Sequence, residues 1–287
     1  GATVSKTSSG YSLLNLMIGS EGTLGIITEL TLKIIPAPKV VASLIIPFED
    51  LNTALSSVPK IKMSGLNPQA IEFMEREIVL SSERYIGRSV FPQDLEGQQI
   101  GAYLLDAGSQ DELDNMLEQM AELVLDAGAM DVLVADTPAK IKDAWAARSS
   151  FLEAIMHETK LLDECDVVVP VNKIADYLDF VNKTGEECGL VIKSFGHAGD
   201  GNLHIYQCSN DLEEEEFKSR VDKFFEIIYK EAASCGGLVS GEHGIGSGKI
   251  KYLVDSVGET NMALMEGIKR VFDPKMILNP GKVCYRL

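Results

Sequence analysis

The nine residues 196–204, GHAGDGNLH, constrain the fold of this chain more than any other stretch. Two glycines, one of them in an Asp-Gly pair, separate the histidines and oppose a helix. The apolar residues 190–195 and 203–206 on either side are typical of strands, so we expect a hairpin with a glycine-containing loop. Such a hairpin places His197 and His204 opposite each other at the mouth of the loop, within reach of one ion.

A second glycine-bracketed stretch, residues 240–246 (SGEHGIG), adds a third histidine beside a carboxylate. Neighbouring side chains of an extended segment point in opposite directions. This arrangement would allow one of Glu242 and His243 to complete a metal shell with the hairpin histidines while the other faces a substrate. Two histidines and a carboxylate are a common shell for catalytic zinc or iron. From the residues alone, the cluster predicts a metal site or an acid–base site.

The second half of the chain has the element order of a ferredoxin-like unit. Strands are predicted at 166–169, 190–195, 203–206 and 238–240, and helices at 172–188 and 211–234. This order of strand, helix, strand, strand, helix and strand forms an antiparallel sheet with helices on one face. We therefore expect the α+β fold class.

The front half is expected to alternate strands and helices from residue 39 onward. Its clearest helix is 111–126, where apolar residues recur at helical spacing. A helix at 139–158 carries Arg148, whose guanidinium suits carboxylate binding. Residues 24–35 are rich in β-branched side chains and predict a strand, which ends at a proline-containing linker.

The two histidine stretches, 196–204 and 240–246, together resemble the paired signature of the FAD-linked oxidase C-terminal domain family. Its members include glycolate oxidase, D-lactate dehydrogenase and D-2-hydroxyglutarate dehydrogenase. Residues 15–28 (NLMIGSEGTLGIIT) resemble the segment that closes the FAD-binding domain of these enzymes, and residues 273–282 (DPKMILNPGK) resemble their carboxyl end. The resemblance thus covers nearly the whole chain.

Three regions are implied by this resemblance. Residues 1–38 are a C-terminal remnant of a flavin-binding α+β domain, 39–270 form a ferredoxin-like substrate domain, and 271–287 return to the flavin domain. The chain is accordingly expected to be a fragment that lacks most of the FAD-binding domain. We expect the fragment alone to be inactive as an oxidase.

The resemblance implies an FAD-dependent oxidoreductase that acts on the CH–OH group of 2-hydroxy acids by metal-assisted hydride transfer to the flavin. A divalent zinc, iron or manganese ion is assigned to His197, His204 and Glu242. His243 becomes the general base, and Arg148 holds the substrate carboxylate. Flavin contacts are expected from Glu21, Gly22, Gly25 and Asn279.

The substrate is expected to be a small monocarboxylate such as D-lactate or glycolate. Tyr206 stands where some 2-hydroxyglutarate-oxidising relatives carry asparagine, and residues 161–164 offer no basic side chain for a second carboxylate. Electron-transfer flavoprotein or iron–sulfur proteins are possible partners by family analogy alone.

The formal net charge of −17 argues against a nucleic-acid partner, whose phosphates would repel the chain. No apolar run in these residues is long enough to span a membrane and no signal peptide is visible in them, and we expect a cytoplasmic protein. An odd number of widely spaced cysteines suggests neither a disulfide framework nor a zinc site. Reduced, buried thiols are expected at Cys165, Cys188, Cys208, Cys235 and Cys284.

Two other functional classes stay open: a metal-dependent hydrolase, and a non-catalytic metal-binding module in which the histidine cluster is structural. The sequence contains neither a His-Glu-x-x-His motif nor a serine nucleophile elbow, which disfavours a hydrolase. Residues 244–249 (GIGSGK) are not a phosphate loop, because that pattern needs glycine in place of His243 and Ser or Thr in place of Ile250.

Overall fold

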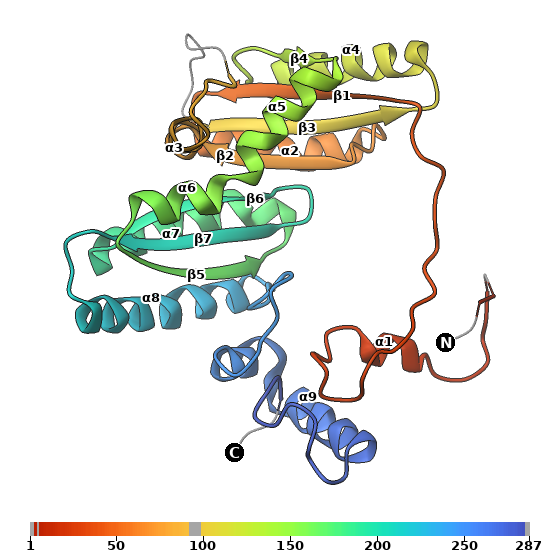
Figure 1. Cartoon of the computed structure of the whole chain (residues 1–287), viewed down its shortest axis with the longest axis vertical. Helices are drawn as coiled ribbons and strands as arrows, with labels where there is room; N and C mark the ends of the chain where they lie inside the picture. Colours follow the sequence, from red (N-terminus) through yellow and green to blue (C-terminus); the bar gives the residue numbers. More distant parts are fainter. Residues whose placement is uncertain (1–2, 5, 92–98, 285–287) are drawn as a thin grey trace.

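The computed structural model describes residues 3–4, 6–91 and 99–284, and its strands form one antiparallel sheet flanked by helices (Figure 1). The strands are β1 Val40–Phe48, β2 Ala70–Glu75, β3 Gln99–Ala107, β4 Leu133–Ala135, β5 Leu161–Val168, β6 Val191–His197 and β7 Asn202–Ser209. The helices are α1 Leu13–Met17, α2 Leu51–Met63, α3 Arg76–Ile86, α4 Gln110–Asp126, α5 Pro138–Ser149, α6 Phe151–Glu158, α7 Ile174–Cys188, α8 Glu214–Ser234 and α9 Ile250–Phe272.

The sheet consists of two ferredoxin-like units that are joined edge to edge. The strand order β4-β1-β3-β2-β6-β7-β5 places β2 beside β6, and a single bridge from Leu238 to Val168 continues the order beyond β5. Each unit therefore has its first and third strands in the middle and its second strand at the seam. The expected α+β, ferredoxin-like fold is confirmed, and it is present twice.

Two apolar clusters cover opposite faces of the sheet. The larger joins alternate strand residues to α2, α4, α7, α8 and α9, and includes Phe73, Leu203 and Phe224. The smaller packs α3, α5 and α6 on the other face, against residues such as Met74 and Phe195. The helical layer expected on one face is present, and three additional helices cover part of the second face. The polar side chains described below lie on that second face.

Helix boundaries follow local sequence signals. Ser109, the N-cap residue of α4, accepts a hydrogen bond from the Glu112 backbone N–H, and the Glu112 carboxylate accepts one from the N–H of Gly108, the residue before the cap. Helix α7 ends at Gly189, which has a φ of 66°. The predicted helices 111–126 and 172–188 are thus close to the observed ones.

The helix predicted at 139–158 is broken into α5 and α6 at Ser150. Neither proline nor glycine causes the break. The Ser150 hydroxyl instead donates to the carbonyl of Ala147 at 3.1 Å and also contacts the Ser82 hydroxyl, so it competes with the helical backbone. The break allows α5 and α6 to follow different directions across the sheet (Figure 1).

The strand predicted at residues 24–35 is wrong, because this segment forms no sheet pairing with other described residues. Its apolar side chains are exposed, among them Ile26 at 79%, Leu32 at 75% and Ile34 at 88%. High β propensity is insufficient for a strand when no neighbouring strand accepts its hydrogen bonds. The predicted strand 238–240 is likewise reduced to the Leu238 bridge. Periodicity also missed β2 and α3 entirely.

Burial was expected for all five cysteines; it is confirmed for four of them and wrong for Cys235, which is half-buried, and all five are free. In the part of the chain that the structure describes, no helix combines the length and apolar character needed to cross a membrane.

Gly201 provides a test of this fold, because it lies in the hairpin loop with a φ of +78° and any Cβ there would collide with the carbonyl oxygen of Val169. Gly236 has a similar φ of +81° but open space around its Cα. Denaturant unfolding is expected to show a loss of about 1 kcal/mol for Gly236→Ala, and about 2 to 4 kcal/mol for Gly201→Ala. Equal losses in the two variants would contradict the close approach of the two chains at Gly201.

Candidate active site

The candidate site lies on the sheet face opposite the larger core. Strand alternation places His197, His204 and Tyr206 on this face together with Phe195, while Leu203 and Ile205 point into the larger core. The predicted hairpin is confirmed, but its register differs in detail. His204 pairs with Phe195 and His197 pairs with Asn202, so the two histidines are diagonal neighbours with ring centroids 5.5 Å apart.

The loop 240–243 is held over this face by the buried carboxylate of Asp166. One oxygen of Asp166 accepts hydrogen bonds from the backbone N–H groups of Gly241, Glu242 and His243 at 2.8, 2.8 and 3.0 Å. Burial raises the pKa of Asp166, but these N–H groups and the ammonium of Lys249 outweigh that effect and lower it well below the ordinary range. The loop thus has a fixed position beside β5.

The three histidines direct their Nε2 atoms toward one carboxylate oxygen. Glu242 Oε1 lies 3.0 Å from His204 Nε2, 3.8 Å from His197 Nε2 and 3.7 Å from His243 Nε2. His204 is 5% exposed, whereas the side chains of Glu242 and His243 are 47% and 44% exposed. Both predicted stretches therefore meet at one place, where Glu242 and His243 are open to a ligand.

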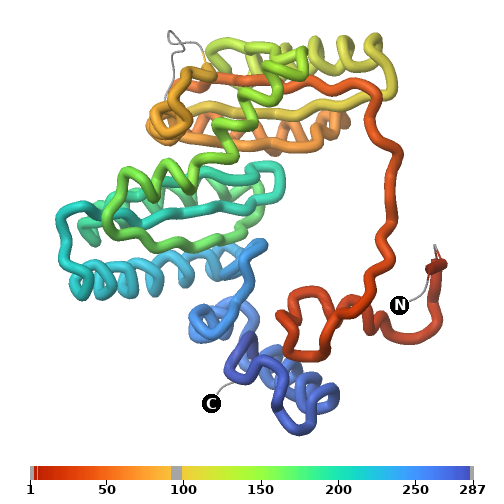
Figure 2. Tube along the Cα trace, viewed as in Figure 1, coloured from red at the N-terminus to blue at the C-terminus, as the bar shows by residue number. Residues whose placement is uncertain are grey.

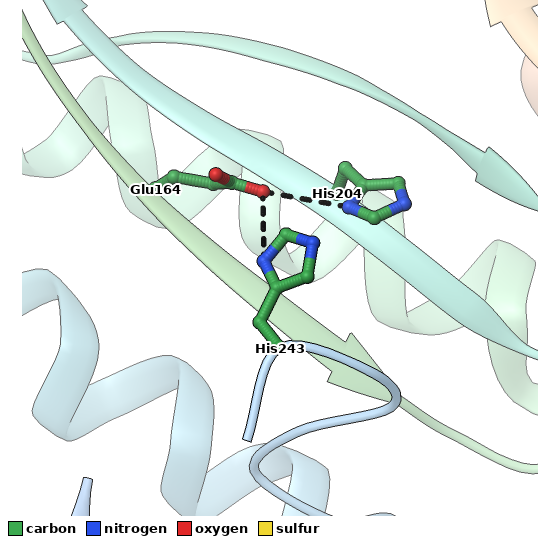
Figure 3. Close-up of side chains that lie close together, drawn as sticks. All are labelled: Glu164, His204 and His243. Carbon is green, nitrogen blue, oxygen red and sulfur yellow. Dashed lines mark ion pairs between the residues drawn. The ribbon is translucent and has the colours of Figure 1, made fainter. Parts of the chain in front are cut away.

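Carboxylates on neighbouring strands contact the opposite nitrogen of each ring. Glu72 Oε1 is 2.6 Å from His197 Nδ1, and this hydrogen bond raises the pKa of His197. Glu164 Oε1 lies 3.4 Å from His204 Nδ1 and 3.3 Å from His243 Nδ1, as Figure 3 shows. Burial raises the pKa of Glu164, but the two imidazoles outweigh that effect and lower it. The hydrogen bond to Glu72 favours the His197 tautomer whose Nε2 lone pair is free to accept a proton or an ion, whereas Glu164 Oε1 and His204 Nδ1 are buried without a hydrogen-bond partner among the described residues.

The residues fit a divalent ion in donor type and spacing. Ligand atoms of His197, His204 and Glu242 all lie within 4.8 Å of one another, as do those of Glu164, His204 and His243. Ligand atoms about 2.1 Å from a tetrahedral zinc are about 3.4 Å apart, close to the distances that separate Glu242 from its two histidines. His204 belongs to both groups through different ring nitrogens.

Arg148 is brought to the same face by α5. Its Nε donates to Glu72 Oε2 at 2.8 Å, and its guanidinium carbon lies 4.6 Å from the centre of the Phe195 ring. Phe195 in turn contacts His204, with ring centroids 5.4 Å apart. The predicted carboxylate-binding residue is therefore a neighbour of the histidine cluster.

The N-terminal and C-terminal segments of the described chain lie side by side (Figure 2), and three of the four residues predicted to contact flavin, Glu21, Gly22 and Asn279, bond across them. Glu21 accepts hydrogen bonds from the N–H groups of Ile245 and Gly246 at 2.6 and 2.8 Å, while Asn279 donates to the carbonyl of Gly22 at 3.0 Å. Glu21 thus holds the end of the histidine loop. Gly25 has no heavy atom near the position of a Cβ and is not part of this group.

Sequence patterns missed three acidic residues of the site: Glu72, Glu164 and Asp166. They lie on β2 and β5, and their register partners are His197, Tyr206 and His204. The alternation of polar residues in 164–166 indicates one face of a strand. Which strand pairs with it depends on the tertiary structure and cannot be read from the local sequence. Only Glu164 and Asp166 had a local signal that could have found them.

Comparison with known sequences finds FAD-linked oxidases and their relatives. A family model described as FAD linked oxidases, C-terminal domain, matches residues 37–283. The D-lactate dehydrogenase of Anaerostipes hadrus is 62% identical, with 100% of this chain and 61% of that protein covered. Glycolate oxidase subunit GlcD of Bacillus subtilis is 32% identical, with 99% and 59% covered. The chain therefore spans about three fifths of the length of these relatives.

Solved structures share the fold. The structure of p-cresol methylhydroxylase with substrate bound has a TM-score of 0.66 at 16% identity, and the match covers 88% of this chain and 54% of the other. Alkyldihydroxyacetonephosphate synthase has a TM-score of 0.58 at 17% identity, covering 96% and 50%. At this level of identity the likeness concerns the fold alone.

Asp166→Asn tests the anchoring of the histidine loop. We expect the free energy of unfolding at about pH 7 to fall by about 2 to 4 kcal/mol, because Lys249 and three N–H groups lose a charged acceptor. Since the pKa of Asp166 is lowered by folding, its contribution is present at neutral pH and is lost as the pH falls below about 4. The stabilities of wild type and variant should therefore converge in acid.

Urea unfolding across this pH range measures the difference. Asp222→Asn is the control, because the exposed pair of Asp222 with Lys251 is expected to contribute less than about 1 kcal/mol. A difference between wild type and Asp166→Asn that stays constant into acid would contradict a stabilising carboxylate.

Proposed function

Because the chain belongs to the FAD-linked oxidase C-terminal domain family, we propose that it supplies the substrate-binding and acid–base part of a flavin-dependent oxidoreductase for a small D-2-hydroxy acid. The membership confirms the family resemblance seen in the sequence. The observation that carries the proposal is the convergence of three histidines on Glu242 beside an arginine, in a chain similar to D-lactate dehydrogenase and glycolate oxidase sequences.

We assign a divalent zinc, iron or manganese ion to His197, His204 and Glu242. Charge supports this assignment: four carboxylates of the site, Glu72, Glu164, Asp166 and Glu242, face two cationic side chains, Arg148 and Lys249. With neutral imidazoles the group carries a net charge of −2, which favours a cation. A bound ion would lower the pKa of a hydroxyl group that coordinates it.

His243 is the proposed general base. Its exposed ring is oriented by Glu164 at Nδ1, which leaves Nε2 to accept the hydroxyl proton of a substrate. Flavin, when bound, accepts the hydride from the substrate carbon. The segment 20–25 and Asn279 are proposed to border the flavin, and the role of Glu21 would be to connect that segment to the histidine loop.

Arg148 is proposed to hold the substrate carboxylate through its terminal amino groups, since Nε is bonded to Glu72. Lys249 is engaged by Asp166, so of the two cationic side chains named above, Arg148 is the one left for a substrate carboxylate. Tyr206 is buried and stacks on Phe195 with centroids 5.4 Å apart. These features favour a monocarboxylate such as D-lactate or glycolate. A cytoplasmic location and redox partner proteins stay predictions.

Metal content tests the ligand assignment. After reconstitution with zinc, manganese or iron(II) and removal of free metal, elemental analysis should find about one ion per chain, and His204→Ala and Glu242→Ala should both lose it. His157→Ala is the control, because this fourth histidine lies away from the site beside Tyr85. Retention of the ion in both ligand variants would refute the assignment.

Flavin reduction tests the reaction class. We would join this chain to the part of the Anaerostipes hadrus D-lactate dehydrogenase that its match leaves uncovered, load the protein with FAD, and add D-lactate or glycolate without oxygen. Loss of oxidised-flavin absorbance is expected, slowed about 100-fold or more by His243→Gln in a protein with unchanged circular dichroism. Metal-dependent ester hydrolysis without flavin reduction would favour the hydrolase, and neither reaction would favour the binding module.

A further inference from the structure

Glu72 occupies the seam between the two ferredoxin-like units. It lies on β2 of the first unit and is the register partner of His197 on β6 of the second. Its neighbours Ile71 and Phe73 point into the larger core, so its own side chain is on the histidine face. Glu72 is only 3% exposed, and a carboxylate so deeply buried is destabilising unless it is fully paired.

The two oxygens of Glu72 have different partners. Oε1 lies 2.6 Å from His197 Nδ1, and Oε2 accepts the Nε–H of Arg148 at 2.8 Å. Both are short contacts to a charged carboxylate that is itself shielded from water, while the His197 ring is 35% exposed. One side chain thus joins a proposed metal ligand to the proposed carboxylate-binding residue.

Each contact determines which atoms of the partner remain available. The carboxylate holds the imidazole proton of His197 on Nδ1, so the Nε2 lone pair is free on the side of Glu242. For Arg148, Glu72 engages Nε while Phe195 lies against the guanidinium plane. Among the described residues no other hydrogen bond of Arg148 is found, so both terminal amino groups are available for an anion.

We propose that Glu72 is a positioning residue that couples ion binding at His197 to carboxylate binding at Arg148, an inference that rests on the proposed function of the site. Its negative charge separates two cationic groups that would otherwise face each other, the bound ion and the guanidinium. A glutamine has one acceptor oxygen in place of two and no charge. If that oxygen accepts from Arg148, the amide nitrogen faces His197 and donates to Nδ1, which moves the imidazole proton to Nε2 and removes the lone pair on the side of Glu242.

Binding measurements with cobalt(II) and D-lactate test the coupling without flavin and without turnover. For Glu72→Gln we expect the affinity for cobalt(II) to fall about 10- to 100-fold, and the affinity of the cobalt-loaded protein for D-lactate to fall about 10-fold or more. Arg148→Gln should weaken D-lactate binding alone. Glu72→Asp, which retains the charge, should lose less than Glu72→Gln. Cobalt(II) and D-lactate affinities of Glu72→Gln within twofold of wild type would overturn the proposal.

Nuclear magnetic resonance of the metal-free protein separates this inference from the proposed function. Wild type should show His197 with its proton on Nδ1 and a slowly exchanging Nε–H for Arg148, whether or not the protein binds an ion or a hydroxy acid. Glu72→Gln should lose at least one of these signals. If the glutamine variant does not fold, Glu72→Asp replaces it in this experiment. Its shorter side chain reaches fewer partners, so it too should lose at least one signal. Absence of both signals from wild type would overturn the proposal.

Discussion

The pairing of β2 with β6 is the constraint on which the rest of the molecule depends. Three residue pairs in register, from Glu72–His197 to Met74–Phe195, join the four strands of the first unit to the three strands of the second in one sheet. The register at this seam places the β2 side chains on the same two faces as those of β6. Phe73 lies in the larger core, while Glu72 and Met74 lie on the opposite face. Because side-chain direction alternates along a strand, a shift of one residue at this seam would bury Phe73 among the histidines and move Glu72 into the core.

The candidate site is assembled from both units and from the connection between them. Its histidines come from the second unit and the loop after α8, Glu72 comes from the first unit, and Arg148 comes from α5. Three carboxylates contact these groups: the buried Asp166 binds the loop backbone, the buried Glu72 joins His197 to the Arg148 guanidinium, and the half-buried Glu164 lies against the other two imidazoles. Rigid strands thus position the groups that a ligand would meet at the surface.

The sequence predicted the features that local patterns encode. Glycine and histidine spacing identified the hairpin and the loop 240–246, and helical periodicity identified α4, α7 and α8. Residues 70–75 were missed because a short strand followed at once by a helix has too few residues to establish a period. The reverse error occurred at 24–35, where high β propensity predicted a strand but no strand of the described chain pairs with this segment. The contribution of Glu72 was hidden because it depends on which two strands meet.

The contacts at the N-terminal end have a consequence for how the chain responds to a protease. Glu21 bonds to the loop 245–246, Thr23 accepts a hydrogen bond from the buried ammonium of Lys269, and Asn279 bonds to Gly22. Residues 25–38, which follow, are mostly exposed and extended (Figure 2). A cut within them would sever the covalent link while these hydrogen bonds still held the short piece. The nicked protein would migrate as two fragments in a denaturing gel and elute as one species under native conditions.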